Sequence, residues 1–331
     1  MDSQMDVSNI RTIEERLEHA TEYARQKMHW HWWVIRLSLP INIALIIFVF
    51  DPMLKGEHWA LAAGGVILAV IALGMTAMSR RMKQFTTPTP EQKAAIDDAL
   101  NARNYPLAIQ LVDNVLTYIH SAETLKLAAI VYARGGKFHE AEVTSRDAAT
   151  IFKRYSTSRY TKKEKADHKR TISDTQTLLG IALNYQRRFG EAEEVLLEAM
   201  KTDPTNEWPL SNYAETLLFQ QKSIPLALDT LQKAETLWVK NNRQPKLAHL
   251  STRAWAYALL GDRATAEKYI QEATRMTDER NNPALTSEVY YIVGLAYQAL
   301  GDDDEARRAF NRAIDADPKG FAAQLAARCL Q

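Results

Sequence analysis

Cysteine and an excess of charge are what this sequence most lacks. Its 331 residues include a single cysteine, Cys329, so neither an intramolecular disulfide nor a zinc site built from several cysteines can form. Lysine and arginine total 41, against 40 aspartates and glutamates. Because proteins that bind nucleic acid usually present a basic surface, this balance argues against a nucleic-acid partner. The single cysteine also fits a reducing compartment.

Motifs that mark common enzyme classes are missing too. The sequence has no G-x-x-x-x-G-K-[ST], no G-x-G-x-x-G after a strand, no H-E-x-x-H and no G-x-S-x-G. The eight histidines are scattered along the chain. We therefore expect a protein that is not an enzyme, with no catalytic residues, no cofactor and no metal site.

Two long apolar stretches lie near the N-terminus, at 32–52 and 58–79. The second has no charged side chain from Trp59 to Ser79. As a helix it would span about 30 Å, the thickness of bilayer hydrocarbon. The first contains Arg36 near its start, where a long side chain can reach the headgroups. We predict two transmembrane helices within residues 32–80.

The ends of these stretches predict their orientation. Basic residues cluster before the first stretch and after the second, whereas the connecting turn has only Lys55. By the positive-inside rule, we expect an integral protein of the plasma (inner) membrane with both termini in the cytoplasm. Indole rings favour the membrane interface, which accounts for the run MHWHWW at 28–33. The expected interface residues are Trp30, Trp32, Trp33, Arg36, Trp59, Arg80 and Arg81.

Residues 1–31 are predicted to be a cytoplasmic segment with an amphipathic helix. Ile10, Ile13, Leu17, Ala20 and Ala24 follow a three/four spacing and form one apolar stripe. The stripe could pack on the membrane surface or on the protein's own soluble domain. Alternatively, it could form a short coiled coil that makes the protein a homo-oligomer. Because the stripe is thin and ends in alanines, we favour packing.

A repeated helical pattern follows a threonine- and proline-rich linker at 81–90. Its clearest unit, VYYIVGLAYQALGDDDEARRAFNRAIDADP, has as its markers Tyr290, Val293, Gly294, Tyr297, Ala306, Phe310, Ala313 and Pro318. This unit resembles the tetratricopeptide repeat, with its W-x2-L-G-x2-Y, A-x3-F and P pattern. A second unit, from Leu179 to Pro204, has the same internal spacing.

Four weaker units share the alanine of the second helix. The six marker alanines are Ala108, Ala141, Ala192, Ala227, Ala266 and Ala306, separated by 33, 51, 35, 39 and 40 residues. The family period is about 34 residues. The predicted fold is all-α: an N-terminal transmembrane helical hairpin, then an α-solenoid of about six helix-turn-helix units over residues 91–331. An unrelated helical bundle is the alternative.

The longest interval contains a basic insertion at about 152–171. Its sequence FKRYSTSRYTKKEKADHKR holds eight lysines and arginines against Glu164 and Asp167. We interpret it as a solvated helix extension or loop. The alternative is a basic patch that contacts anionic lipid headgroups or an acidic partner.

The resemblance implies a concave groove, lined by the first helices, that binds a peptide segment or a protein surface. One subgroup of the family clamps a C-terminal carboxylate with asparagines. Here the corresponding positions hold Ile130, Ile181, Trp255 and Leu295, which argues against that mode. The candidate groove residues are Asn184, Tyr185, Asn212, Trp255, Tyr291 and Gln298, for each of which packing within the solenoid is an equal interpretation.

The function that we predict is recruitment without chemistry. The protein would be a membrane-anchored scaffold or adaptor, with a protein partner in its groove and the lipid bilayer as a second partner. The alternative is a non-catalytic assembly or regulatory subunit of a membrane protein complex.

Overall fold

The computed structural model describes residues 87–155, 157, 160–241, 247–280 and 282–331. The chain divides into two compact units, Met1–Ile96 and Asp97–Gln331. The described end of the first unit is the start of α3 (Pro90–Asn101). Thr89 and Gln92 cap this helix reciprocally, because the Gln92 amide donates to Thr89 Oγ1 at 3.2 Å and the Thr89 amide donates to Gln92 Oε1 at 2.9 Å.

The predicted membrane segments lie outside the described residues. These are the helix within 1–31, the spans at 32–52 and 58–79, most of the 81–90 linker and all seven expected interface residues. The coiled coil that would make a homo-oligomer therefore stays a prediction.

Among the helices of the described residues, none is both long enough and apolar enough to cross a membrane. Even the longest, α7 (Lys162–Tyr185), begins with the charged run KKEKADHKR. Charged side chains within a span cost several kcal/mol each. The predicted location, an integral protein of the plasma (inner) membrane with cytoplasmic termini, is contradicted by this finding, and we withdraw it. The lipid bilayer is likewise not supported as a partner.

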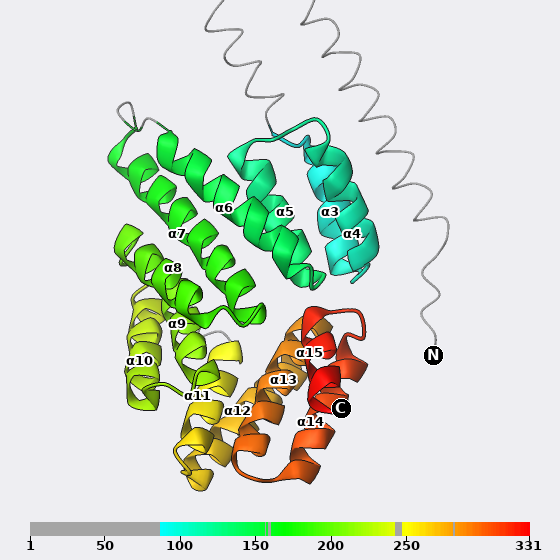
Figure 1. The fold of residues 1–331 in the computed structure, drawn as a ribbon, viewed down its shortest axis with the longest axis vertical. Helices are drawn as coiled ribbons and strands as arrows, with labels where there is room; N and C mark the ends of the chain where they lie inside the picture. The colour runs from blue at the N-terminus through cyan, green and yellow to red at the C-terminus, as the bar shows by residue number, and fades with distance from the viewer. Residues whose placement is uncertain (1–86, 156, 158–159, 242–246, 281) are drawn as a thin grey trace, which may run out of the picture. The chain divides into compact units, whose positions relative to one another are not determined.

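The second unit is built from helices alone in its described residues (Figure 1). After α3 come α4 (Tyr105–Leu116), α5 (Ala122–Arg134), α6 (Phe138–Arg154), α7 (Lys162–Tyr185), α8 (Phe189–Thr202), α9 (Glu207–Phe219), α10 (Ile224–Lys240), α11 (Leu247–Leu259), α12 (Arg263–Arg280), α13 (Pro283–Ala299), α14 (Asp303–Ala316) and α15 (Phe321–Cys329). The all-α prediction is confirmed for this part of the chain.

Neighbouring helices pack in hairpins, and the hairpins stack. The pairs are α5–α6, α7–α8, α9–α10, α11–α12 and α13–α14. The first helix of one pair also packs against the first helix of the next, as α11 does against α13 and α7 does against α9. The last helix, α15, packs against α13 and α14, where the first helix of a further repeat would lie. This is the tetratricopeptide-like solenoid that the repeats predict.

Small residues allow the two helices of a hairpin to cross closely. A Cβ atom on Gly180 would lie 2.6 Å from Cγ of Leu196, and one on Gly294 would lie 2.4 Å from the Phe310 ring. All six marker alanines are buried, with at most 4 % of their surface exposed. A hairpin buries only one of its faces in this way, so its other apolar face is covered by the next hairpin.

The basic segment around 152–171 ends α6 and begins α7. Thr161 caps α7, accepting a hydrogen bond from the Glu164 amide while Glu164 accepts one from the Thr161 amide. Lys162, Lys163 and Lys165 are exposed on the first turns of this helix. The lengthened α7 therefore accounts for much of the long interval between the second and third marker alanines.

The contact between Gly294 and Phe310 generates a stability prediction. Gly294→Ala should gain about 1 kcal/mol in helix propensity but lose about 1–3 kcal/mol through overpacking, because Phe310 is itself buried. We expect a net fall in the free energy of unfolding, measured by urea denaturation. Gly190→Ala is the matched control, since a Cβ there meets nothing within 4 Å. A Gly294→Ala chain as stable as the Gly190→Ala chain would contradict the close-crossing account.

Candidate functional site

Polar side chains from distant repeats converge on one side of the second unit. Tyr185 ends α7, and its hydroxyl donates to Glu215 Oε1 on α9 at 3.2 Å. The pKa of Tyr185 is raised well above its ordinary value by burial and then by Glu215, by Tyr291 and by Glu288, the last two on α13. Two complete hairpins separate α7 from α13 in the chain, so these side chains lie near enough to affect the pKa of Tyr185 only on the inside of the curve. We call Tyr185, Glu215, Glu288 and Tyr291 the inner face.

A row of aromatic rings runs beside the inner face. Phe138 stacks on Tyr185 with ring centroids 4.9 Å apart. Phe219 lies 6.2 Å from Tyr185 and 5.0 Å from Trp255, both in edge contacts. These four residues, which we call the aromatic row, come from four successive repeats. Aromatic rings carry much of the binding energy at protein interfaces, so the row gives the inner face a surface suited to a protein segment.

The Glu215 carboxyl group has an unusual environment for an acid. Burial raises its pKa to about 7, with the hydrogen bond from Tyr185 opposing the shift and the nearby Glu288 contributing to it. A buried carboxylate next to a second one is costly unless a cation or a proton neutralises it. The inner face is therefore acidic and partly dry.

Four of the six predicted groove residues lie at or next to this site. Tyr185 and Tyr291 belong to the inner face, and Trp255 belongs to the aromatic row, with 6 % of its surface exposed. Gln298 is exposed two turns after Tyr291 on the same face of α13.

The two asparagines are engaged in helix packing. Asn184 is buried and donates to Thr216 Oγ1 at 2.7 Å, which joins α7 to α9. Asn212 donates to the Trp208 carbonyl one turn earlier in α9, at 2.9 Å. For both side chains the packing interpretation fits this geometry.

Sequence reasoning missed five residues of this region: Phe138, Glu215, Phe219, Glu288 and Phe321. Glu215 occupies a position of the repeat that is ordinarily polar. Its raised pKa depends on side chains from α7 and α13, which are distant in the sequence. Phe138 precedes the marker alanine of its unit by three positions and has no family signature. A helical projection that aligned the first helices of all units could have found Glu215, but the other contacts depend on long-range geometry.

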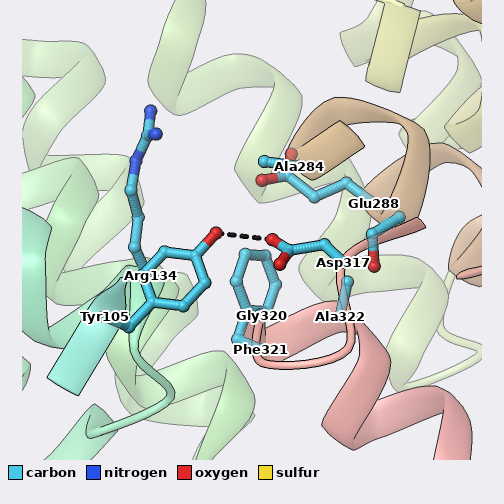
Figure 2. A pocket seen from close by; sticks show the side chains of 9 residues that line it. Tyr105, Arg134, Ala284, Glu288, Asp317, Gly320, Phe321 and Ala322 are labelled. Atoms are coloured by element: carbon cyan, nitrogen blue, oxygen red, sulfur yellow. Dashed lines mark hydrogen bonds between the residues drawn. The ribbon is translucent and has the colours of Figure 1, made fainter. Parts of the chain in front are cut away.

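A pocket lies next to the inner face, between the first and last repeats of the second unit (Figure 2). It is lined by Tyr105, Arg134, Ala284, Ser287, Glu288, Asp317, Gly320, Phe321 and Ala322. The Tyr105 hydroxyl donates to Asp317 Oδ2 at 2.5 Å, while the Arg134 side chain extends away from that pair. The pocket has room for about one water molecule. It is thus too small for a cofactor, and no group of three potential metal ligands occurs among the described residues.

The half-buried Glu215 makes stability depend on pH. The folded chain keeps the Glu215 proton up to about pH 7, whereas an unfolded chain loses it near 4.5. The contribution of Glu215 to the free energy of unfolding is therefore fully present below pH 4.5, where the carboxyl is protonated in both states. It is lost as pH rises towards 7, because the unfolded chain ionises first. Glu215→Gln keeps the shape and cannot ionise. Between pH 5 and pH 8 we expect this variant to gain stability over the wild type by on the order of 2 kcal/mol.

Thermal and urea unfolding across that pH range measure the effect. Glu194→Gln, at an exposed position on α8, is the matched control and should follow the wild type at every pH. Equal pH dependence in the Glu215→Gln and wild-type chains would show that Glu215 is not held in a dry, acidic environment.

Comparison with known proteins supports the repeat interpretation. Residues 287–319 match the family model described as "Tetratricopeptide repeat". This segment is the unit that the sequence pattern marks most clearly. No curated protein matches the sequence.

Solved structures with a similar fold are distant in sequence. The Rap conjugation gene regulator of the plasmid pLS20, in complex with a Phr peptide, has a TM-score of 0.50 and 15% identity over 71% of this chain and 73% of its own. The apo form of RapI has a TM-score of 0.49 and 12% identity over 68% of this chain and 95% of its own. YrrB, a TPR protein with an unusual peptide-binding site, has a TM-score of 0.33 and 12% identity over 77% and 97%. At these identities the likeness concerns the fold alone. The fold of the Rap conjugation gene regulator, together with the family match over residues 287–319, supports a tetratricopeptide-repeat solenoid.

Proposed function

We propose that the protein is a binding scaffold that holds a segment of a partner protein against its inner face and aromatic row. The observation that carries the proposal is that Tyr185, Glu215 and Tyr291, from three repeats, lie beside the rings of Phe138, Phe219 and Trp255. Such a surface offers apolar contact and hydrogen bonds along several repeats, which suits an extended or helical segment better than a small molecule.

The fold supports the same proposal. Tetratricopeptide-repeat proteins are generally non-catalytic scaffolds, and the similar Rap regulator is in complex with a peptide. The work of the protein would then be recruitment, with no bond made or broken.

A second candidate is an assembly or regulatory subunit of a larger protein complex. The second helices carry exposed apolar side chains, namely Val143, Leu197, Leu226 and Val239, of which Val239 is 67 % exposed. In this case the outer side of the hairpins would bear the main contact.

Site-specific photo-crosslinking distinguishes the two candidates. A benzoylphenylalanine at Gln298 of the full chain would probe the inner side, and the same group at Val239 would probe the outer side. The scaffold predicts adducts to a discrete protein from position 298, with the crosslinked partner peptide identified by mass spectrometry. Adducts from position 239 alone would contradict the scaffold and favour the subunit.

A further inference from the structure

The C-terminal segment Asp317–Cys329 reaches back to the beginning of the second unit. Besides the bond from Tyr105 to Asp317, Arg103 donates from Nη1 to the Ala316 carbonyl at 2.9 Å. Both Tyr105 and Asp317 are buried, at 3 % and 2 % exposure. Two hydrogen bonds therefore join the first repeat to the end of α14 across most of the chain.

Phe321, the first residue of α15, extends this contact onto the aromatic row. Its ring lies 5.2 Å from that of Tyr185 and 6.1 Å from that of Phe138. It also lines the pocket beside the Tyr105–Asp317 pair (Figure 2). Phe321 thus covers the part of the aromatic row that is formed by Phe138 and Tyr185.

The turn between α5 and α6 contacts Gln324 of α15. Gly136 has a φ of 75°, and a Cβ there would lie 2.7 Å from Oε1 of Gln324. The glycine therefore permits the turn conformation and leaves room for the end of the Gln324 side chain. Ala322, Ala323 and Ala326 are buried and Leu325 packs against the core cluster, so the packed side of α15 has an aromatic residue followed by small residues and one leucine.

α15 is the shortest helix of the described residues. It has nine residues and no side-chain cap at its N-terminus. A helix this short is not stable alone in water, so it exists only while it is docked. Elements of this kind open locally at a smaller free-energy cost than the core of a domain.

We propose that α15 is a built-in occupant of the aromatic row, which a partner segment with an aromatic residue followed by small apolar residues displaces. The sequence of α15, FAAQLAARC, indicates the chemistry that fits this surface. The proposal rests on the scaffold function for its partner. The apparent affinity of a partner would then be its intrinsic affinity multiplied by the fraction of molecules in which α15 is undocked.

Cys329 is a natural reporter of undocking. It is the single cysteine of the chain, lies at the end of α15 and is half-buried against the core cluster that includes Tyr291. Burial raises the pKa of its thiol. Undocking would expose the thiol and increase its thiolate fraction, so a thiol reagent would react faster.

The first experiment measures the rate at which Ellman's reagent modifies Cys329 in the full chain. Phe321→Ala should raise the rate about tenfold, which corresponds to about 1.4 kcal/mol of lost docking free energy. Tyr105→Phe removes only a hydroxyl group and should raise the rate by a smaller factor. Lys319→Ala, an exposed neighbour, is the control and should leave the rate unchanged. Circular dichroism melts identify any variant that reacts faster because it has unfolded globally.

The second experiment supplies the occupant as a separate molecule. A fluorescein-labelled peptide of residues 317–331, with serine in place of Cys329, should bind the Phe321→Ala chain more tightly than the wild-type chain. The same peptide with alanine in place of Phe321 should not bind. Wild-type reactivity of Cys329 in the Phe321→Ala chain, or equal binding of the two peptides, would overturn the proposal.

These results are independent of the partner. If Phe321→Ala raises the reactivity of Cys329 as expected but no adduct forms at position 298, the scaffold proposal is contradicted and the proposed docking of α15 is supported. If adducts form at position 298 but Cys329 reacts at the same rate in the Phe321→Ala and wild-type chains, the scaffold proposal is supported and the proposed displacement of α15 is contradicted.

Discussion

The close crossing of helices within each hairpin is the contact on which the rest of the second unit depends. Gly180 faces Leu196 and Gly294 faces Phe310 at distances that leave no space for even a methyl group. Helices that approach this closely leave one broad apolar face per hairpin, which only the next hairpin can cover. The same relation repeated along the chain bends the stack, so the ends of first helices from distant repeats share one inner side.

That geometry explains the chemistry of the inner face. Glu215 would be an ordinary surface acid on an isolated α9, but the ends of α7 and α13 remove water from it and bring Glu288 near. Tyr185 contributes both a ring to the aromatic row and a hydroxyl to Glu215. A surface with rings and a partly desolvated acid is costly to leave uncovered, which gives a physical reason for α15 to lie against part of it.

The sequence predicts features that depend on local spacing and misses those that depend on long-range contacts. The unit that contains Gly294 and Phe310 is clear because its markers lie within one hairpin, and the family match falls on it. Tyr185, Trp255 and Tyr291 could be chosen because they lie on first helices. The same logic predicts Asn184 as a groove residue, but its amide joins α7 to α9. Nothing near Phe321 in the sequence indicates that its ring meets Phe138.

Hydrogen–deuterium exchange on the full chain, with and without the partner identified by crosslinking, tests the central claim most directly. The account predicts slower exchange at the C-terminal end of α7, in α9 and in α13, with no change in α8 and α10. Slower exchange confined to α8 and α10 would contradict it, because the partner would then lie on the outer side of the hairpins.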